Sequence, residues 1–261
     1  MLNIGKSHEV IKLVKKVKTK PSNLIYIEDL SVLSLLMEQK KQLEVFLVCE
    51  ELIFSDEAKK IVAYFKDNSK EIYSVSKKVY DDLIDKGFSA GMIGLYAYEF
   101  KSLKEVKNKH FVVVLDGLET PGNLGTILRT CDAYNVDLVI LVDSKTNVYN
   151  PKVVQSSRGM SLSVDIVNTS YEEAQAYLLN NNFDIYLGEP ELGKSYLEYD
   201  YLNNVALVFG NERFGINKNW YSKKHHKLYV PMYGKMTSLN VSVAASIVIC
   251  YAGININKRL G

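Results

Sequence analysis

The sequence is poor in cysteine, histidine and arginine, and these shortages argue against several kinds of site. The three cysteines, Cys49, Cys131 and Cys250, are far apart and odd in number. This argues against a disulfide framework and against a cysteine-based metal site, so we expect reduced and mostly buried thiols. The four histidines, at positions 8, 110, 225 and 226, have no metal-ligand spacing. The sequence therefore predicts no bound metal.

Long hydrophobic runs are also missing. No stretch approaches 18 uninterrupted apolar residues, and the first ten residues lack the apolar segment of a signal peptide. We therefore expect a cytoplasmic protein without a membrane partner. With 261 residues, of which 47% are hydrophobic and 24% charged, the chain is long enough for two modest globular domains.

Positive charge is concentrated at the N-terminus. The net charge of +2 is too small to indicate a nucleic-acid partner, but its distribution is uneven. We predict a local basic arm that contacts RNA phosphates; the alternative is a solvated helix face whose lysines only keep the protein soluble. The lysines of this arm are Lys6, Lys12, Lys15, Lys16, Lys18 and Lys20.

Residues 22–98 alternate between short β-rich runs and amphipathic segments, which is typical of a small α/β domain. A charged, non-periodic stretch follows, so the predicted organisation is a domain at 1–98, a linker at 99–109 and a second domain at 110–261. A turn is expected at 88–91. The expected strands are 23–27, 43–48 and 72–75, and the expected helices are 30–37, 57–65 and 77–84.

The second half opens with a continuous apolar run at 110–116, typical of a parallel strand covered on both faces. The segment P-G-N-L-G that follows predicts a turn leading into a helix. Arg129 stands out in that helix because the chain has only four arginines among 32 basic residues. An arginine supplies fork geometry and a permanent charge. The alternative is a salt bridge to a neighbouring carboxylate.

A second polar loop follows the apolar run at 205–209. Its sequence, G-N-E-R-F-G, places Glu212 between two glycines at the end of a buried strand, before a predicted helix start at residue 216. Ligands bind at this position in open parallel sheets. Alternatively, Glu212 only caps the following helix.

The stretch 228–251 predicts a strand, a loop and a long helix. Thr237 and Ser238 occupy the expected N-cap position, and Asn240 would lie in the anion-tolerant first turn. Small residues occur all round this helix, so we expect burial on more than one side. An ordinary buried C-terminal helix is the alternative.

In order and spacing, these three stretches resemble the motifs of the SpoU (TrmH) family of RNA ribose 2′-O-methyltransferases, members of the knotted SPOUT group. Asn123 and Arg129 match the first motif, Glu212 the second, and the stretch 230–251 the third. Two positions depart from the family: Arg213, where glycine is usual, and Arg158, where an apolar residue is usual. The N-terminal half loosely resembles the substrate-binding domain of many members.

The resemblance implies an α/β fold in which a small N-terminal α/β substrate-binding domain precedes a parallel-sheet domain with a deep C-terminal trefoil knot. It also implies S-adenosylmethionine as the cofactor and a homodimer formed by knot-side helices. The substrate would be RNA, with 23S ribosomal RNA favoured over transfer RNA. The residues implied to bind the cofactor are Phe209, Gly210, Val230, Met232, Ser238 and Leu239.

The residues implied to be catalytic are Arg129, Asn123, Glu212, Ser238 and Asn240. The family assigns the arginine as base, but an arginine pKa above 12 favours stabilisation of the developing alkoxide instead. A nicotinamide dehydrogenase is the competing enzyme class, but no G-x-G-x-x-G follows a strand. An RNA-binding homologue without catalysis is the other alternative.

Overall fold

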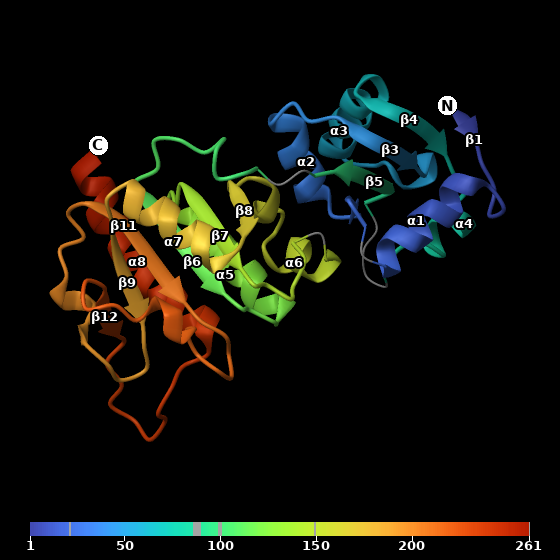
Figure 1. Ribbon diagram of the computed structural model, residues 1–261. Helices are drawn as coiled ribbons and strands as arrows, with labels where there is room; N and C mark the ends of the chain where they lie inside the picture. The colour runs from blue at the N-terminus through green and yellow to red at the C-terminus, as the bar shows by residue number, and fades with distance from the viewer. Residues whose placement is uncertain (21, 86–89, 99–100, 149, 261) are drawn as a thin grey trace. The chain divides into compact units, whose positions relative to one another are not determined.

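The structure is a computed structural model that describes residues 1–261 except 21, 86–89, 99–100, 149 and 261. The chain forms two compact units (Figure 1). The first comprises residues 1–99 and 149–159, and the second residues 100–148 and 160–261. The segment 149–159 belongs to the first unit because helix α6 (Pro151–Ser156) packs on strand β2 (Leu24–Ile27). The predicted turn at 88–91 begins outside the described residues.

The first unit is built on a five-stranded sheet in the order β1-β4-β3-β5-β2, in which β5 is antiparallel to both neighbours. Apolar residues of α1 and α4 share one core with β2, β3 and β5, while α2 packs on α3. The predicted elements of this half are confirmed within a few residues. The other bounds are β1 Leu2–Asn3, α2 Leu30–Glu38, β3 Leu43–Val48, η1 Glu50–Leu52, α3 Asp56–Asp67, β4 Ser69–Ser74, α4 Lys77–Asp81 and β5 Met92–Ala97.

The predicted basic arm is a packed helix, α1 (Glu9–Thr19), whose apolar stripe is buried. Lys18 belongs to the fold: its Nζ donates to the Leu83 carbonyl at 2.7 Å and lies 2.8 Å from Asp85 Oδ1. Lys6 pairs with Asp82. The lysines left exposed, without an ion pair to any described residue, are Lys12, Lys15, Lys16 and Lys20.

The second unit contains a seven-stranded sheet in the order β10-β12-β9-β11-β6-β7-β8, in which all pairs are parallel. β6 (Phe111–Asp116) lies inside the sheet, between β11 and β7, and all its residues are buried, as predicted. Helix α7 covers one face and α8 the other (Figure 1). The other bounds are α5 Pro121–Ala133, β7 Leu138–Val142, η2 Met160–Leu162, β8 Ile166–Thr169, α7 Tyr171–Asn180, β9 Phe183–Gly188, β10 Lys194–Ser195, η3 Tyr196–Glu198, β11 Asn204–Phe209, η4 Lys218–Trp220, β12 His226–Tyr229 and α8 Val241–Leu260.

Helix α8 packs closely on α5. A Cβ on Gly253 would lie 2.8 Å from Tyr134 Cβ, so only glycine permits this approach. Within this chain α8 buries one stripe only, so the prediction of burial on several sides is wrong for the single copy. By length and composition the helix could also cross a membrane, but a core helix meets the same test. The buried stripe consists of Ser242, Ala245, Val248, Ile249, Ala252, Gly253 and Ile256.

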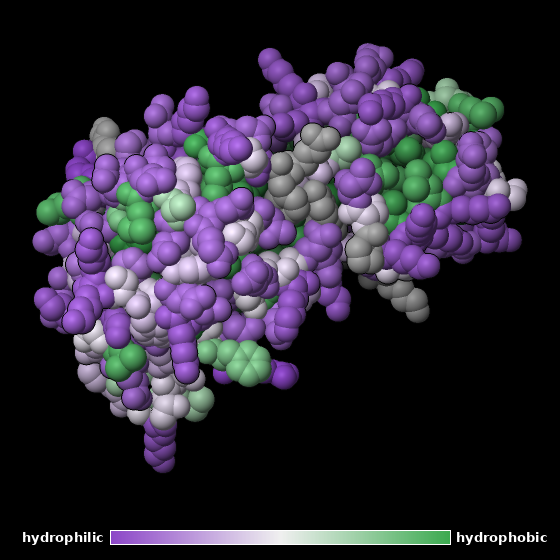
Figure 2. Space-filling model, in the orientation of Figure 1, coloured by the Kyte–Doolittle hydropathy of each residue, from purple (hydrophilic) through white to green (hydrophobic). Residues whose placement is uncertain are grey.

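Two predicted helix starts differ from the structure. Helix α8 begins at Val241, and Asn240, rather than Ser238, caps it: Asn240 Oδ1 accepts from the Ser242 N–H at 2.8 Å. After Ile216 only the three-residue 3₁₀ turn η4 forms. Arg158 follows α6 with a φ of 53°, in the left-handed region. On the face drawn in Figure 2, hydrophobic residues occur as small separate groups among hydrophilic ones.

Candidate active site

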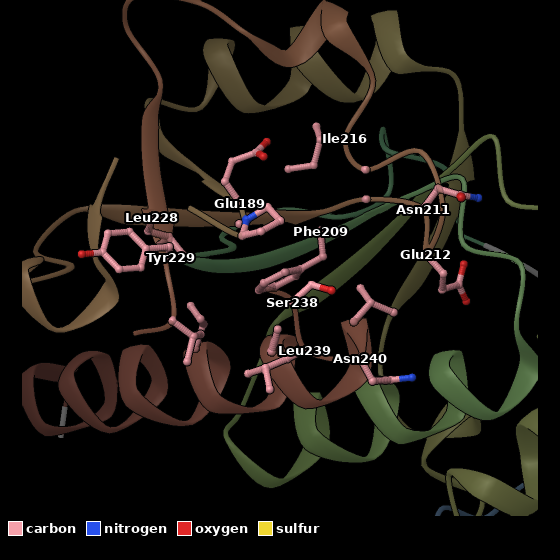
Figure 3. A pocket seen from close by; sticks show the side chains of 18 of the residues that line it. Glu189, Phe209, Asn211, Glu212, Ile216, Leu228, Tyr229, Ser238, Leu239 and Asn240 are labelled. Carbon is pink, nitrogen blue, oxygen red and sulfur yellow. The ribbon is translucent and has the colours of Figure 1, made fainter. Parts of the chain in front are cut away.

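A cavity of about 570 Å³ lies at the carboxyl ends of β9, β11 and β12, beside the first turns of α8 (Figure 3). Parallel α/β sheets bind ligands at this edge because the strand-end loops converge there. Glu212 and Asn240 line the cavity. So do all the predicted cofactor residues: Phe209, Gly210, Val230, Met232, Ser238 and Leu239.

The composition of the cavity walls fits S-adenosylmethionine. Its volume is that of a pocket for a drug-sized ligand. Phe209, Leu228 and Val248 give it an apolar wall suited to an adenine ring. Along the opposite segment, residues 231–239 make no backbone hydrogen bond to any described residue. Their free N–H and C=O groups can therefore hold the polar parts of a ligand.

The loop 211–215 between β11 and Ile216 is closed by its own hydrogen bonds. Asn211 and Gly215 exchange two backbone bonds, of 2.9 and 3.0 Å. The Asn211 side chain accepts from the N–H groups of Arg213 and Phe214 and donates to the Gly117 carbonyl at 2.7 Å. Because Gly117 directly follows β6, Asn211 ties the second motif to the strand beside it.

Asn123 and Glu212 meet although they are 89 positions apart in the chain. Asn123 Nδ2 donates to Glu212 Oε1 at 2.9 Å, and the N–H groups of Thr120 and Glu119 donate to the same carboxylate at 3.0 and 3.2 Å. Glu212 thus binds the two residues that lead into α5 and a side chain of its first turn, not the segment that follows Glu212 itself. Adjacent parallel strands β6 and β11 bring the first and second motifs together.

Two carboxylates of the site have shifted pKa values. Partial burial acts to raise the pKa of Glu212, but the hydrogen bonds donated by Asn123 and two backbone N–H groups outweigh it and lower the pKa. Burial raises the pKa of Asp116, despite the hydrogen bond of 2.7 Å from the Asn217 N–H. Asp116 fastens the segment after the loop 211–215 to the end of β6.

The structure does not bring every predicted catalytic residue into the cavity. Asn123 and Arg129 do not line it. Arg129 is exposed on α5 and forms no ion pair with a described residue, so the salt-bridge alternative fails within that part of the chain. Ser238 and Asn240 are exposed at the cavity. Asn240 Oδ1 is engaged as the cap of α8.

Sequence reasoning missed several residues of the site. Asn211 organises the second motif, and its place directly before Glu212 was the available sign. Asp116 is the last residue of an apolar strand. A carboxylate at that position was the sign that its side chain could hold a neighbouring loop by a hydrogen bond. Glu189 lines the cavity and accepts a hydrogen bond from Tyr221. No sequence pattern indicated that pair.

Glu212→Gln should destabilise the second unit by about 1 kcal/mol at pH 7, since it removes a negative charge that accepts three hydrogen bonds beside the N-terminus of α5. Because the folded pKa of Glu212 is lowered, this stabilisation is present above the unfolded value, near 4.3, and is lost as pH falls through the folded value. Urea unfolding of both proteins at pH 7 and pH 3 measures the difference. An equal difference at both pH values would contradict this assignment.

Comparison with known proteins places this site in a family. The SpoU rRNA Methylase family model matches residues 110–250. A 23S rRNA guanosine 2′-O-methyltransferase of Bacillus subtilis is 34% identical over 138 residues, which cover 53% of this chain and 56% of that enzyme. A protein of Staphylococcus aureus named as a TrmH family tRNA/rRNA methyltransferase is 30% identical over 78% of this chain and 85% of its own length.

The fold agrees with these relatives. The AdoMet-bound rRNA methyltransferase of Sinorhizobium meliloti superimposes with a TM-score of 0.84, at 19% identity and 96% coverage of both chains. Fold and site thus define an S-adenosylmethionine-dependent methyltransferase with a parallel α/β sheet. The chain belongs to the SpoU rRNA methylase family. The family resemblance and the α/β fold class are confirmed, while the knot stays a prediction.

Proposed function

We propose that the protein methylates a ribose 2′-hydroxyl of RNA, with 23S ribosomal RNA as the substrate and the cytoplasm as its location. The Asn123–Glu212 junction beside the cavity carries this proposal, since it joins the first two motifs at the place where a cofactor would bind. The 2′-O-methyltransferase of Bacillus subtilis supports the choice of ribosomal RNA. Transfer RNA is the alternative, and so is binding without catalysis.

The residues of the site suit the chemistry. When bound, S-adenosylmethionine supplies a methyl group on a sulfonium centre. A ribose hydroxyl is a weak nucleophile and must be held in line and relieved of its proton. Asn123 donates its amide to Glu212, which leaves its Oδ1 to accept from the hydroxyl. The hydroxyl proton passes to bulk water as the oxygen–methyl bond forms. Arg129 stabilises the developing alkoxide, while Ser238 and Asn240 orient the ribose.

The direct test incubates the protein with S-adenosylmethionine labelled in its methyl group and with 23S ribosomal RNA or transfer RNA. Ribose methylation protects the adjoining phosphodiester from alkaline hydrolysis, so the label should appear in alkali-resistant dinucleotides of the ribosomal RNA. Label in mononucleotides would indicate base methylation. Cofactor binding without any label transfer would favour the inactive homologue.

The first unit is proposed to recruit the RNA, in keeping with a domain of residues 1–98, a linker of 99–109 and a catalytic domain of 110–261. Replacing the exposed α1 lysines, Lys12, Lys15 and Lys16, by alanine should weaken RNA binding. The log–log slope of affinity against salt should fall by roughly 0.7–0.9 for each phosphate that is no longer neutralised. A salt series of affinities measures both effects. The matched control replaces three other exposed lysines of this unit, Lys41, Lys60 and Lys66. If both variants give the same salt-dependence curve as the unaltered protein, the α1 lysines do not contact RNA.

A homodimer is proposed through the open face of α8. Besides its buried stripe, α8 carries a second apolar stripe that includes Val243 and Ile254, which are 47% and 42% exposed. Apolar residues at helical spacing on an open face favour a partner helix, here a second copy. The mass by analytical ultracentrifugation should be twice that of the chain. Val243→Glu with Ile254→Glu should give a monomer, and a monomeric unaltered protein would contradict the proposal.

A further inference from the structure

Phe214 is the most exposed phenylalanine among the described residues, with 82% of its surface accessible. Single exposed hydrophobic residues are common, so exposure alone carries little weight. The position is what differs here: Phe214 lies two residues after Glu212, in the loop 211–215. The function proposed above does not use its side chain.

The hydrogen bonds of the loop 211–215 fix the backbone of Phe214. The Phe214 N–H donates to Asn211 Oδ1 at 3.1 Å, and the bonds between Asn211 and Gly215 close the loop beneath it. Asn211 is itself fastened to Gly117 at the end of β6. Because the backbone is already ordered, only the two side-chain torsions of the phenylalanine need to be ordered when a ligand binds, so little conformational entropy is lost.

Phe214 itself does not line the cavity, but its neighbours in the loop do. Glu212, its neighbour but one, contacts Asn123 on α5, and Arg213 lines the cavity. Figure 3 shows Asn211 and Glu212 together at one end of the cavity, away from Glu189 and Leu228. The loop therefore carries an exposed aromatic side chain just outside the end of the cavity that Glu212 and Arg213 line.

We propose that Phe214 is a stacking platform for the nucleobase of the methylated nucleotide. The inference rests on the proposed function, and it names the group that recognises the substrate. Proteins hold unpaired RNA bases by stacking them on aromatic side chains, since every base has a π-face. Stacking the base on Phe214 would fix the attached ribose beside Asn123. Arg213, exposed and without an ion pair to a described residue, suits the neighbouring phosphate.

The test measures RNA affinity and single-turnover rate for Phe214→Ala, with an RNA fragment that carries the mapped methylation site. Loss of a stacked base should weaken RNA binding roughly tenfold. Affinity for S-adenosylmethionine, measured by calorimetry, should stay unchanged. Phe214→Trp, which keeps a π-face, should retain near-normal binding. Leu202→Ala is the control, since Leu202 is 65% exposed in the second unit and stands just before β11, at the strand end away from the cavity.

A second arm uses the same RNA with the base of the target nucleotide removed. If Phe214 stacks on that base, the abasic RNA should bind the unaltered protein and Phe214→Ala equally weakly. Independent, additive losses would overturn the proposal. If the Phe214→Ala protein is a monomer where the unaltered protein is a dimer, the ring belongs to the contact between copies. That result would also overturn the stacking proposal. Normal methylation by Phe214→Ala would refute stacking while leaving the proposed function intact, whereas an unaltered protein that methylates no RNA would refute both.

Discussion

Arg129→Ala is expected to lower the rate of methyl transfer more than tenfold and to leave the affinity for S-adenosylmethionine unchanged. The residue is exposed on α5 and lies outside the cavity lining, so it can act on the RNA side only. A tenfold loss corresponds to about 1.4 kcal/mol of transition-state stabilisation. Single-turnover rates at saturating cofactor, together with calorimetric affinities, measure the two effects.

The role assigned to Arg129 is electrostatic. A guanidinium carries five N–H donors and no acceptor, so it is better suited to stabilise an alkoxide and a phosphate than to accept a proton. Arg129→Lys keeps the charge but loses the fork geometry, and it should recover part of the rate. A loss smaller than tenfold in the alanine variant would be too small for this role and would leave Asn123 and Glu212 as the main catalytic groups.

Gly210→Val is expected to abolish cofactor binding. The family resemblance implied that Gly210 binds the cofactor, so a side chain here would enter the ligand site. The structure gives a different reason, because a Cβ on Gly210 would lie 2.2 Å from the backbone carbon of Gly215 and 2.3 Å from the Ile216 nitrogen. Any side chain must push away the loop 211–215, and with it one end of the cavity.

Calorimetry with the folded variant checks this result, with circular dichroism to show that the sheet persists. Gly122→Ala is the matched control, since a Cβ there has no atom within 4 Å. Gly210→Ala should already weaken binding, because the clash is with backbone. Unchanged affinity in a folded Gly210→Val protein would show that the loop does not shape the cofactor site.

The hydrophobic periodicity predicted most strands and helices, because this periodicity depends only on residues that are close together in the sequence. The apolar run 110–116 became the buried strand β6, and the P-G-N-L-G turn became the start of α5. The order of the three motifs also predicted the family and the class of chemistry. Glycine-bounded loops after buried strands are local features, and their position at the carboxyl ends of strands follows from the parallel sheet.

Helix ends and lysine roles depended on contacts that periodicity does not contain. Ser238 and Asn240 are both acceptable caps by residue type, and the chain path selected Asn240. Lys18 looked like its neighbours in sequence, yet packing placed its ammonium group against Asp85 and Leu83. Helix α6 joined the first unit through its contact with β2, a pairing of residues far apart in the chain.

The sequence by itself determined which residue types follow which strands, because hydrophobic periodicity and turn-forming residues are properties of consecutive residues. Only the tertiary structure decided which of those loops meet. Strand order placed β11 beside β6, and this pairing brought Glu212 to Asn123 and fastened Asn211 to Gly117. It also left Phe214 exposed on a closed loop. Strand order depends on the packing of the whole sheet, and no single segment contains that information.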